Sequence, residues 1–175
     1  MAEERYHIRM KRGHNRRLRF WFCPVNDKIM NADQDWPEEA ELSCDSICTR
    51  ELFFPFIKKY YPGEFLWKNE LNLMPFDQVR AMIKEVRKYA RLMKRNWNDP
   101  RLRKITKRID IDLLVDSEEY EEKYMNAPDA VRRRAVEENA DVVIEFYTRL
   151  CDWLEKTMDH YEPAGYNNMA IFAPH

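Results

Sequence analysis

Residues 75–97 read PFDQVRAMIKEVRKYARLMKRNW, and this stretch decides the fold. Its apolar residues recur at spacings of three and four, the pattern of an amphipathic helix that buries one face. Pro75 suits the first turn of such a helix. The apolar stripe consists of Val79, Met82, Ile83, Val86, Tyr89, Ala90, Met93 and Trp97. The sequence therefore predicts a helix of about six turns whose stripe packs against the rest of the chain.

The side of this helix opposite the stripe is basic. Residues 79–108 contain twelve Lys or Arg and only two acids, Glu85 and Asp99, in a chain whose net charge is −1. Such a local excess of positive charge indicates a polyanion or an acidic protein surface as partner. The twelve basic residues are Arg80, Lys84, Arg87, Lys88, Arg91, Lys94, Arg95, Arg101, Arg103, Lys104, Lys107 and Arg108.

A second long apolar stripe predicts a helix over residues 129–161, opened by Pro128. At 1.5 Å per residue it spans about 45–50 Å and can pack antiparallel along the whole 75–97 helix. Its acidic ridge is expected to be solvated, and consists of Asp141, Glu145, Asp152, Glu155 and Asp159. The residues predicted to be buried between the two helices are Val86, Met93, Val143, Phe146, Leu150 and Leu154.

The N-terminal part of the chain has the period of β-structure. Apolar and polar residues alternate over 5–11 and again over 17–23, and a stretch with Gly13 and Asn15 joins the two runs. This pattern predicts a β-hairpin over residues 5–23. One of its faces would cover the core, and its outer face would carry several basic residues.

The segments between these elements have less regular patterns. Residues 26–46 are rich in Asp and Glu and predict an acidic loop. A helix is expected to begin near Ser43 or Ser46, to kink or restart at Pro55, and to end at the turn formed by residues 61–63. A short basic helix is predicted over 100–109, an acidic stretch follows over 110–122, and residues 163–175 form a tail.

These elements predict one domain over residues 1–175, of α+β class and mostly α-helical. The hairpin would lie on a helical core, 46–161, of three or four helices, two of them long and antiparallel. Only three glycines are present, which argues against glycine-rich phosphate loops. The sequence shows no export signal and no apolar run near the ~20 residues of a membrane span, so we expect a cytoplasmic protein with no membrane contact. Four cysteines are expected to be reduced thiols, Cys23, Cys44, Cys48 and Cys151.

The functional hypothesis is a non-enzymatic accessory module that contacts the backbone of a nucleic acid. Basic groups on one helix face can follow phosphates, and basic residues beside aromatic ones in the hairpin suit single strands. Two alternatives remain open: an acidic segment, 26–46 or 110–122, folds over the basic face, or an acidic protein partner binds it, as for a small inhibitor or adaptor. The predicted nucleic-acid-binding residues are Arg17, Arg19, Arg80, Lys84, Arg87, Arg91 and Lys94.

Other chemistries have weaker signals. Cys44 and Cys48 would share a helix face and, with Cys23 and His7 or His14, could make a zinc site, but a single i, i+4 pair is a weak pattern. The carboxylates at positions 110 and 112 could serve a metal-dependent nuclease or simply form an exposed turn. The four histidines lie in no recognised motif. We therefore predict no catalytic residue, no bound metal and no cofactor. The sequence leaves the oligomeric state open.

Overall fold

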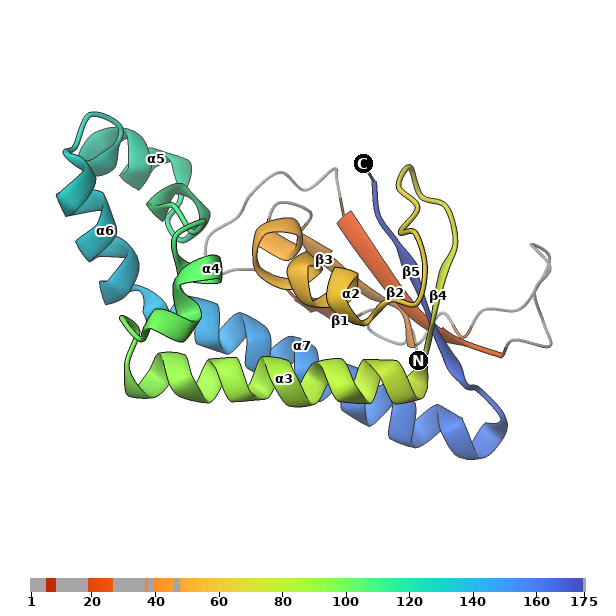
Figure 1. Ribbon diagram of the computed structural model, residues 1–175. Helices are drawn as coiled ribbons and strands as arrows, with labels where there is room; N and C mark the ends of the chain where they lie inside the picture. Colours follow the sequence, from red (N-terminus) through yellow and green to blue (C-terminus); the bar gives the residue numbers. More distant parts are fainter. Residues whose placement is uncertain (1–5, 9–18, 27–36, 38–39, 46–47, 175) are drawn as a thin grey trace.

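The computed structural model describes residues 6–8, 19–26, 37, 40–45 and 48–174 (Figure 1). Five strands form one sheet in the order β1-β3-β2-β5-β4. Strand β1 pairs with β3 in parallel, and the other neighbours are antiparallel. The bounds of the strands are Tyr6–Ile8 for β1, Arg19–Val25 for β2, Leu42–Asp45 for β3, Asn72–Pro75 for β4 and Asn168–Phe172 for β5.

The two N-terminal strands predicted at 5–11 and 17–23 are present as β1 and β2, but their pairing as a 5–23 hairpin was wrong. Strand β3 lies between them, and β2 and β3 form the antiparallel pair. Part of the predicted acidic loop is therefore the strand β3. The reason is burial: Leu42 and Cys44 are fully buried and extend the apolar face of Phe20 and Phe22, the residues they pair with. The alternation of apolar and polar residues within a strand shows on which face each side chain lies, but not which strand pairs with it.

The predicted tail is also part of the sheet. Strand β5 lies between β2 and β4, and Met169, Ala170 and Ile171 are buried. Strand β4 was not predicted and forms an edge of the sheet. Asn72 of β4 is buried, and its side-chain amide donates to the carbonyl oxygen of Leu66 at 2.8 Å and to that of Ile171 at 3.0 Å. These bonds connect the edge strand to the preceding loop and to β5.

The helices account for most of the described chain, which confirms the mostly helical α+β class. In Figure 1, α2, α3 and α7 pack against the sheet, and α4, α5 and α6 lie beyond its end, on the left. The longer helices are α2 (Phe54–Tyr60), α3 (Phe76–Arg95), α6 (Asp129–Glu138) and α7 (Ala140–Tyr161). The shorter ones are η2 (Thr49–Phe53), η3 (Pro100–Leu102), α4 (Arg103–Thr106), η4 (Ile111–Leu113), α5 (Ser117–Glu119), η5 (Tyr120–Tyr124) and η6 (Glu162–Ala164).

Pro55 lies in the first turn of α2, which follows the π-helical turn η2, so the predicted restart of a helix at this proline is confirmed. Of the two predicted starts of this helical segment, Ser43 was wrong, because residues 42–45 form β3, and Ser46 lies outside the described residues. The end at residues 61–63 is confirmed, since α2 ends at Tyr60. The short basic helix expected over 100–109 consists of η3 and α4, and its inward residues Leu102 and Ile105 are buried.

The two long helices pack antiparallel, as predicted, but the second is interrupted. The chain breaks between α6 and α7 at Asn139, where φ is −105° and ψ is 18°. The Asn139 side chain donates to the carbonyl oxygen of Ala135 at 2.8 Å and so competes for a backbone acceptor of the helix. The six residues predicted to be buried between the helices are all buried: Val86, Met93, Val143, Phe146, Leu150 and Leu154.

Candidate nucleic-acid interface

Near the N-terminal end of α3, Arg80 pairs with carboxylates at the C-terminal end of α7 and in η6, the turn that follows it. A guanidinium nitrogen of Arg80 lies 2.6 Å from a carboxylate oxygen of Glu162, and the other terminal nitrogen lies 3.6 Å from Asp159. The hydrogen bond with Glu162, together with the nearby carboxylates, raises the pKa of Arg80. This end of α3 therefore presents little unbalanced charge.

One to two turns further along α3, Arg87 makes a second bridge to α7. One of its guanidinium nitrogens lies 2.9 Å from an oxygen of Asp152 and 2.6 Å from an oxygen of Glu155. Burial opposes the charged form of Arg87, but the hydrogen bonds with Glu155 and Asp152 outweigh it and raise the pKa. The acidic ridge of the long helix was expected to be solvated, and the Asp152 and Glu155 side chains are indeed about half exposed, at 49% and 51%, but they also pair with Arg87 of α3, which was not predicted.

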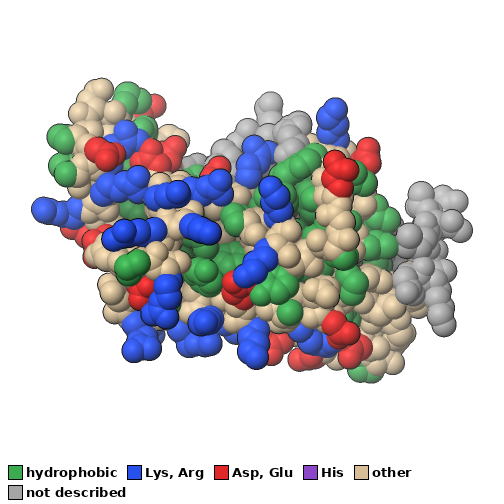
Figure 2. Space-filling model, viewed as in Figure 1, with side chains coloured by type: hydrophobic (Ala, Val, Ile, Leu, Met, Phe, Trp, Pro, Cys, Tyr) green, Lys and Arg blue, Asp and Glu red, His purple; other side chains and the backbone are tan. Residues whose placement is uncertain are grey.

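The C-terminal half of α3 differs from this. Four exposed basic residues there, and Lys84 just before them, make no ion pair within the described part of the chain, and four more follow in α4 and the turn after it. Figure 2 shows Lys and Arg side chains gathered over this end of α3 and around α4 and α6, with few acidic side chains between them. We define the basic surface as Lys84, Lys88, Arg91, Lys94, Arg95, Arg103, Lys104, Lys107 and Arg108.

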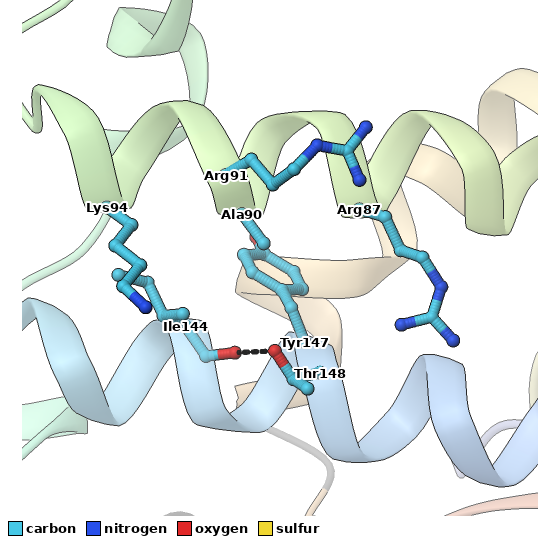
Figure 3. Close-up of a pocket in the computed structure, with 7 residues that line it drawn as sticks. All are labelled: Arg87, Ala90, Arg91, Lys94, Ile144, Tyr147 and Thr148. Atoms are coloured by element: carbon cyan, nitrogen blue, oxygen red, sulfur yellow. Dashed lines mark hydrogen bonds between the residues drawn. The ribbon is translucent and has the colours of Figure 1, made fainter.

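A pocket of about 250 Å³ lies where α3 and α7 meet beside this surface (Figure 3). Its basic wall comes from α3, and its other wall comes from α7. Tyr147 is fully buried and its hydroxyl donates to the carbonyl oxygen of Leu52 at 2.6 Å, so the pocket receives only its ring. The lining residues are Arg87, Ala90, Arg91, Lys94, Ile144, Tyr147 and Thr148.

The structure brings three of the predicted site residues together at this pocket, namely Arg87, Arg91 and Lys94. Arg80 and Lys84 lie further toward the N-terminus of α3. Arg19 begins β2, and because side chains alternate along a strand it shares the face of Trp21, whereas Phe22 faces the helices and packs on Phe53 at 6.4 Å between ring centroids. The sheet therefore separates Arg19 from α3.

Arg17 lies outside the described residues, as do residues 27–36 of the predicted acidic loop. The other acidic segment, 110–122, has local partners. The Asp110 carboxylate pairs with Arg132 of α6 and also accepts the backbone N–H of Ile111. Arg132 in turn donates to the hydroxyl of Tyr120 at 3.1 Å. The carboxylate suggested for a nuclease is thus engaged by an arginine.

The contribution of α7 to this region was not predicted from the sequence. Thr148 and Ile144 line the pocket, and neither was among the predicted site residues. A signal was present, because Thr148 is a short neutral residue between Glu145 and Asp152 on an otherwise acidic ridge. Its meaning depends on the register of α7 against α3, which periodicity alone does not give.

The cysteines are packed in the core. Cys44 and Cys48 are fully buried, and burial is the main cause that raises the pKa of both thiols. Burial also raises the pKa of Cys151 to about 12. Over the ranges the structure describes, no group of three or more His, Cys, Asp or Glu residues is placed to hold a metal ion. His14 lies outside those ranges, and of His7 only the backbone is described.

No family model, curated protein or solved structure matches this chain. Among the described helices, none is both long and apolar enough to cross a membrane. The candidate interface therefore stands on its geometry and charge.

Proposed function

We propose that this protein binds nucleic acid through the phosphate backbone, as a non-enzymatic accessory module. The observation that carries the proposal is the basic surface, whose nine side chains make no ion pair with any acid in the part of the chain that the structure describes. Arg80 and Arg87 are removed from the set of predicted contacts, because α7 and the turn η6 after it already supply their counter-charges.

The geometry of the basic surface suits a linear polyanion. Lys84, Lys88, Arg91 and Lys94 are spaced at three or four residues along α3, so they form one row on a rigid helix. Arg103 and Lys104 of α4 extend the positive charge beyond the end of α3. A nucleic-acid backbone bound to such a row releases condensed counterions, which gives binding that depends on salt and not on base sequence.

The proposal includes a cytoplasmic location. The four cysteines are free thiols, as is usual in a reducing compartment. The proposal assigns no reaction to the protein.

The test is fluorescence anisotropy with labelled single-stranded and double-stranded oligonucleotides of DNA and RNA, at a series of salt concentrations starting at about 50 mM. We expect the logarithm of the binding constant to fall linearly with the logarithm of the salt concentration. The double reversal Arg91→Glu and Lys94→Glu changes two charges of the row and is expected to abolish binding. Single neutral substitutions in the row are each expected to lower the magnitude of the salt slope by about one.

The matched control reverses two exposed lysines outside α3 and α4, Lys68→Glu and Lys156→Glu. Both double variants change the net charge equally, so a long-range effect of net charge alone would weaken binding in both. Equal losses in the two double variants contradict the proposed surface. Absence of binding by the unaltered protein to every oligonucleotide at low salt contradicts the function itself, and leaves an acidic protein surface as the class of partner.

A further inference from the structure

The contact between α3 and α7 is a series of charge pairs that stops partway. From the N-terminal end of α3, Arg80 meets Asp159 and Glu162, and Arg87 meets Asp152 and Glu155. The next basic residues of α3 on this side are Arg91 and Lys94, and the next residue of α7 in the same antiparallel register is Thr148. The series therefore ends where α7 offers a hydroxyl in place of a carboxylate.

The pocket lies at this point. The Thr148 side chain is shorter than those of Asp152 and Glu155, which pair with Arg87. Its hydroxyl donates to the carbonyl oxygen of Ile144 at 2.9 Å, within its own helix. Arg91 and Lys94 line the pocket from α3: Lys94 extends toward Ile144 of α7, and Arg91 runs along α3 in the direction of Arg87 (Figure 3). Glu145 continues the acidic ridge, but it does not line the pocket and makes no ion pair with Lys94 among the described residues.

We infer that this pocket binds a terminal phosphate group, a phosphate monoester, of a nucleic-acid strand that lies on the basic surface. The inference rests on the proposed function and adds a specific site to it. The same chemistry is offered by a free mononucleotide, and the experiment below separates the two sources.

Charge favours a monoester over the phosphates within a strand. A phosphodiester carries one negative charge, whereas a phosphate monoester carries between one and a half and two near neutral pH. Arg91 and Lys94 supply two positive charges with no carboxylate between them, and Arg87 adds a third that Asp152 and Glu155 already balance. A terminal phosphate is joined to the strand through one oxygen only, so it can enter a pocket walled by two packed helices more easily than a phosphate within the strand, which is joined on both sides.

The probe is one oligonucleotide sequence prepared in three forms: with a 5′ phosphate, with a 3′ phosphate, and with hydroxyls at both ends. Affinities are measured by anisotropy with the full chain. We expect at least one phosphorylated form to bind at least about ten-fold more tightly than the unphosphorylated form, a factor near the low end of what one charge-assisted hydrogen bond supplies. The ratio of the two affinities is the readout, because loss of a backbone contact lowers both together.

The decisive variant is Thr148→Glu, which places a carboxylate against Arg91 and Lys94 and completes the series of pairs. We expect it to bring the ratio to one while the melting temperature stays the same or rises. Gln78→Glu adds the same charge at an exposed position near the start of α3 and is the matched control. Lys94→Gln is expected to remove the preference, and Lys84→Gln, on the same helix but outside the pocket, to keep it.

The outcomes separate the inference from the function it rests on. Equal affinities for all three forms contradict the terminal-phosphate pocket and leave backbone binding in place. A preference that survives Thr148→Glu contradicts the assignment to this pocket. If no oligonucleotide binds, the proposed function is wrong, and so is the strand-end inference. Binding of adenosine monophosphate alone, abolished by Thr148→Glu, then identifies a pocket for a free mononucleotide instead.

Discussion

The hydroxyl of Tyr147 donates a hydrogen bond of 2.6 Å to the backbone carbonyl oxygen of Leu52, and both residues are fully buried. This bond connects the middle of α7 to the π-helical turn η2, which precedes α2. Burial raises the pKa of Tyr147, so the phenol stays protonated and remains a donor. The ring packs edge-on against Phe56 of α2, with 6.0 Å between centroids.

Replacing Tyr147 with Phe removes the hydrogen bond and keeps the ring. We expect the free energy of unfolding to fall by about 1 kcal/mol, the usual net value of such a bond. Urea denaturation followed by circular dichroism measures this change. Tyr147→Ala also removes the ring and is expected to cost about 3–5 kcal/mol. Equal losses for the two variants would show that the hydrogen bond, not the ring, holds α7 to η2.

Leu150 lies on the buried side of α7 and is 0% exposed. Leu150→Ala leaves a cavity against α3, so we expect a loss of about 2–5 kcal/mol in the free energy of unfolding. Lys156→Ala, at an exposed position of the same helix, is the control and is expected to change stability by less than about 0.5 kcal/mol. A small loss for Leu150→Ala would mean that the contact between α3 and α7 is misplaced.

Arg87 and Arg91 lie one turn apart on α3 and are expected to behave differently. Arg87→Gln breaks the bridge to Asp152 and Glu155, and we expect it to lower stability by about 0.5–1 kcal/mol at low salt. Arg91→Gln removes a charge with no ion pair in the described chain and is expected to leave stability unchanged. Thermal melts at low and high salt measure both, and the Arg87 effect is expected to shrink with salt. If only Arg91→Gln lowered the melting temperature, Arg91 and not Arg87 would be the residue paired with the carboxylates of α7.

Glu85 makes part of the stability depend on pH. Burial acts to raise the pKa of this carboxyl, but hydrogen bonding with Lys59, at 2.6 Å, and with Tyr60 outweighs it, so the pKa is lowered from its ordinary value of 4.5. The ionised form therefore stabilises the fold above the pKa of the unfolded chain, and this contribution disappears as the pH falls through the lower pKa of the folded state.

We expect Glu85→Gln to reduce the urea midpoint at about pH 7, and we expect this deficit to shrink as the pH falls below the ordinary pKa of the carboxyl, because protonation removes the ionised form. Glu64→Gln, an exposed position on the loop after α2, serves as the control and is expected to have no effect at any pH in this range. A Glu85→Gln deficit that persists at low pH would mean that packing, and not the charge, is lost.

Helix α3 was predicted to within two residues at each end because its apolar stripe is continuous and its flanks carry clear stop signals. The interruption at Asn139 was not, because the apolar stripe runs on from α6 into α7 and hides a local break in the backbone. Strand β5 was missed for a different reason. Met169, Ala170 and Ile171 are all buried, so the alternation that identifies a strand with one wet face is absent.

The candidate site, too, could be predicted from the sequence only in part. The excess of positive charge over α3 and α4 could be counted in the sequence, but not which charges remain unbalanced. Arg87 and Arg91 have the same side chain and the same helical face. They differ because Asp152 and Glu155 lie opposite one and Thr148 lies beside the other. That difference depends on the axial register between two packed helices that are distant in the sequence.

The position of β5 between β2 and β4 sets the order in which the protein can assemble during synthesis. Strands β2 and β4 are synthesised long before β5, which pairs with both. Until β5 is made, the backbone edges of β2 and β4 that pair with it have no hydrogen-bond partner. Closing contacts over such long sequence separations is slow, because the entropy of the intervening chain must be lost first. A nascent chain that ends before Asn168 has two open strand edges, which are sites of aggregation. We therefore expect productive folding to be completed only after β5 has been made.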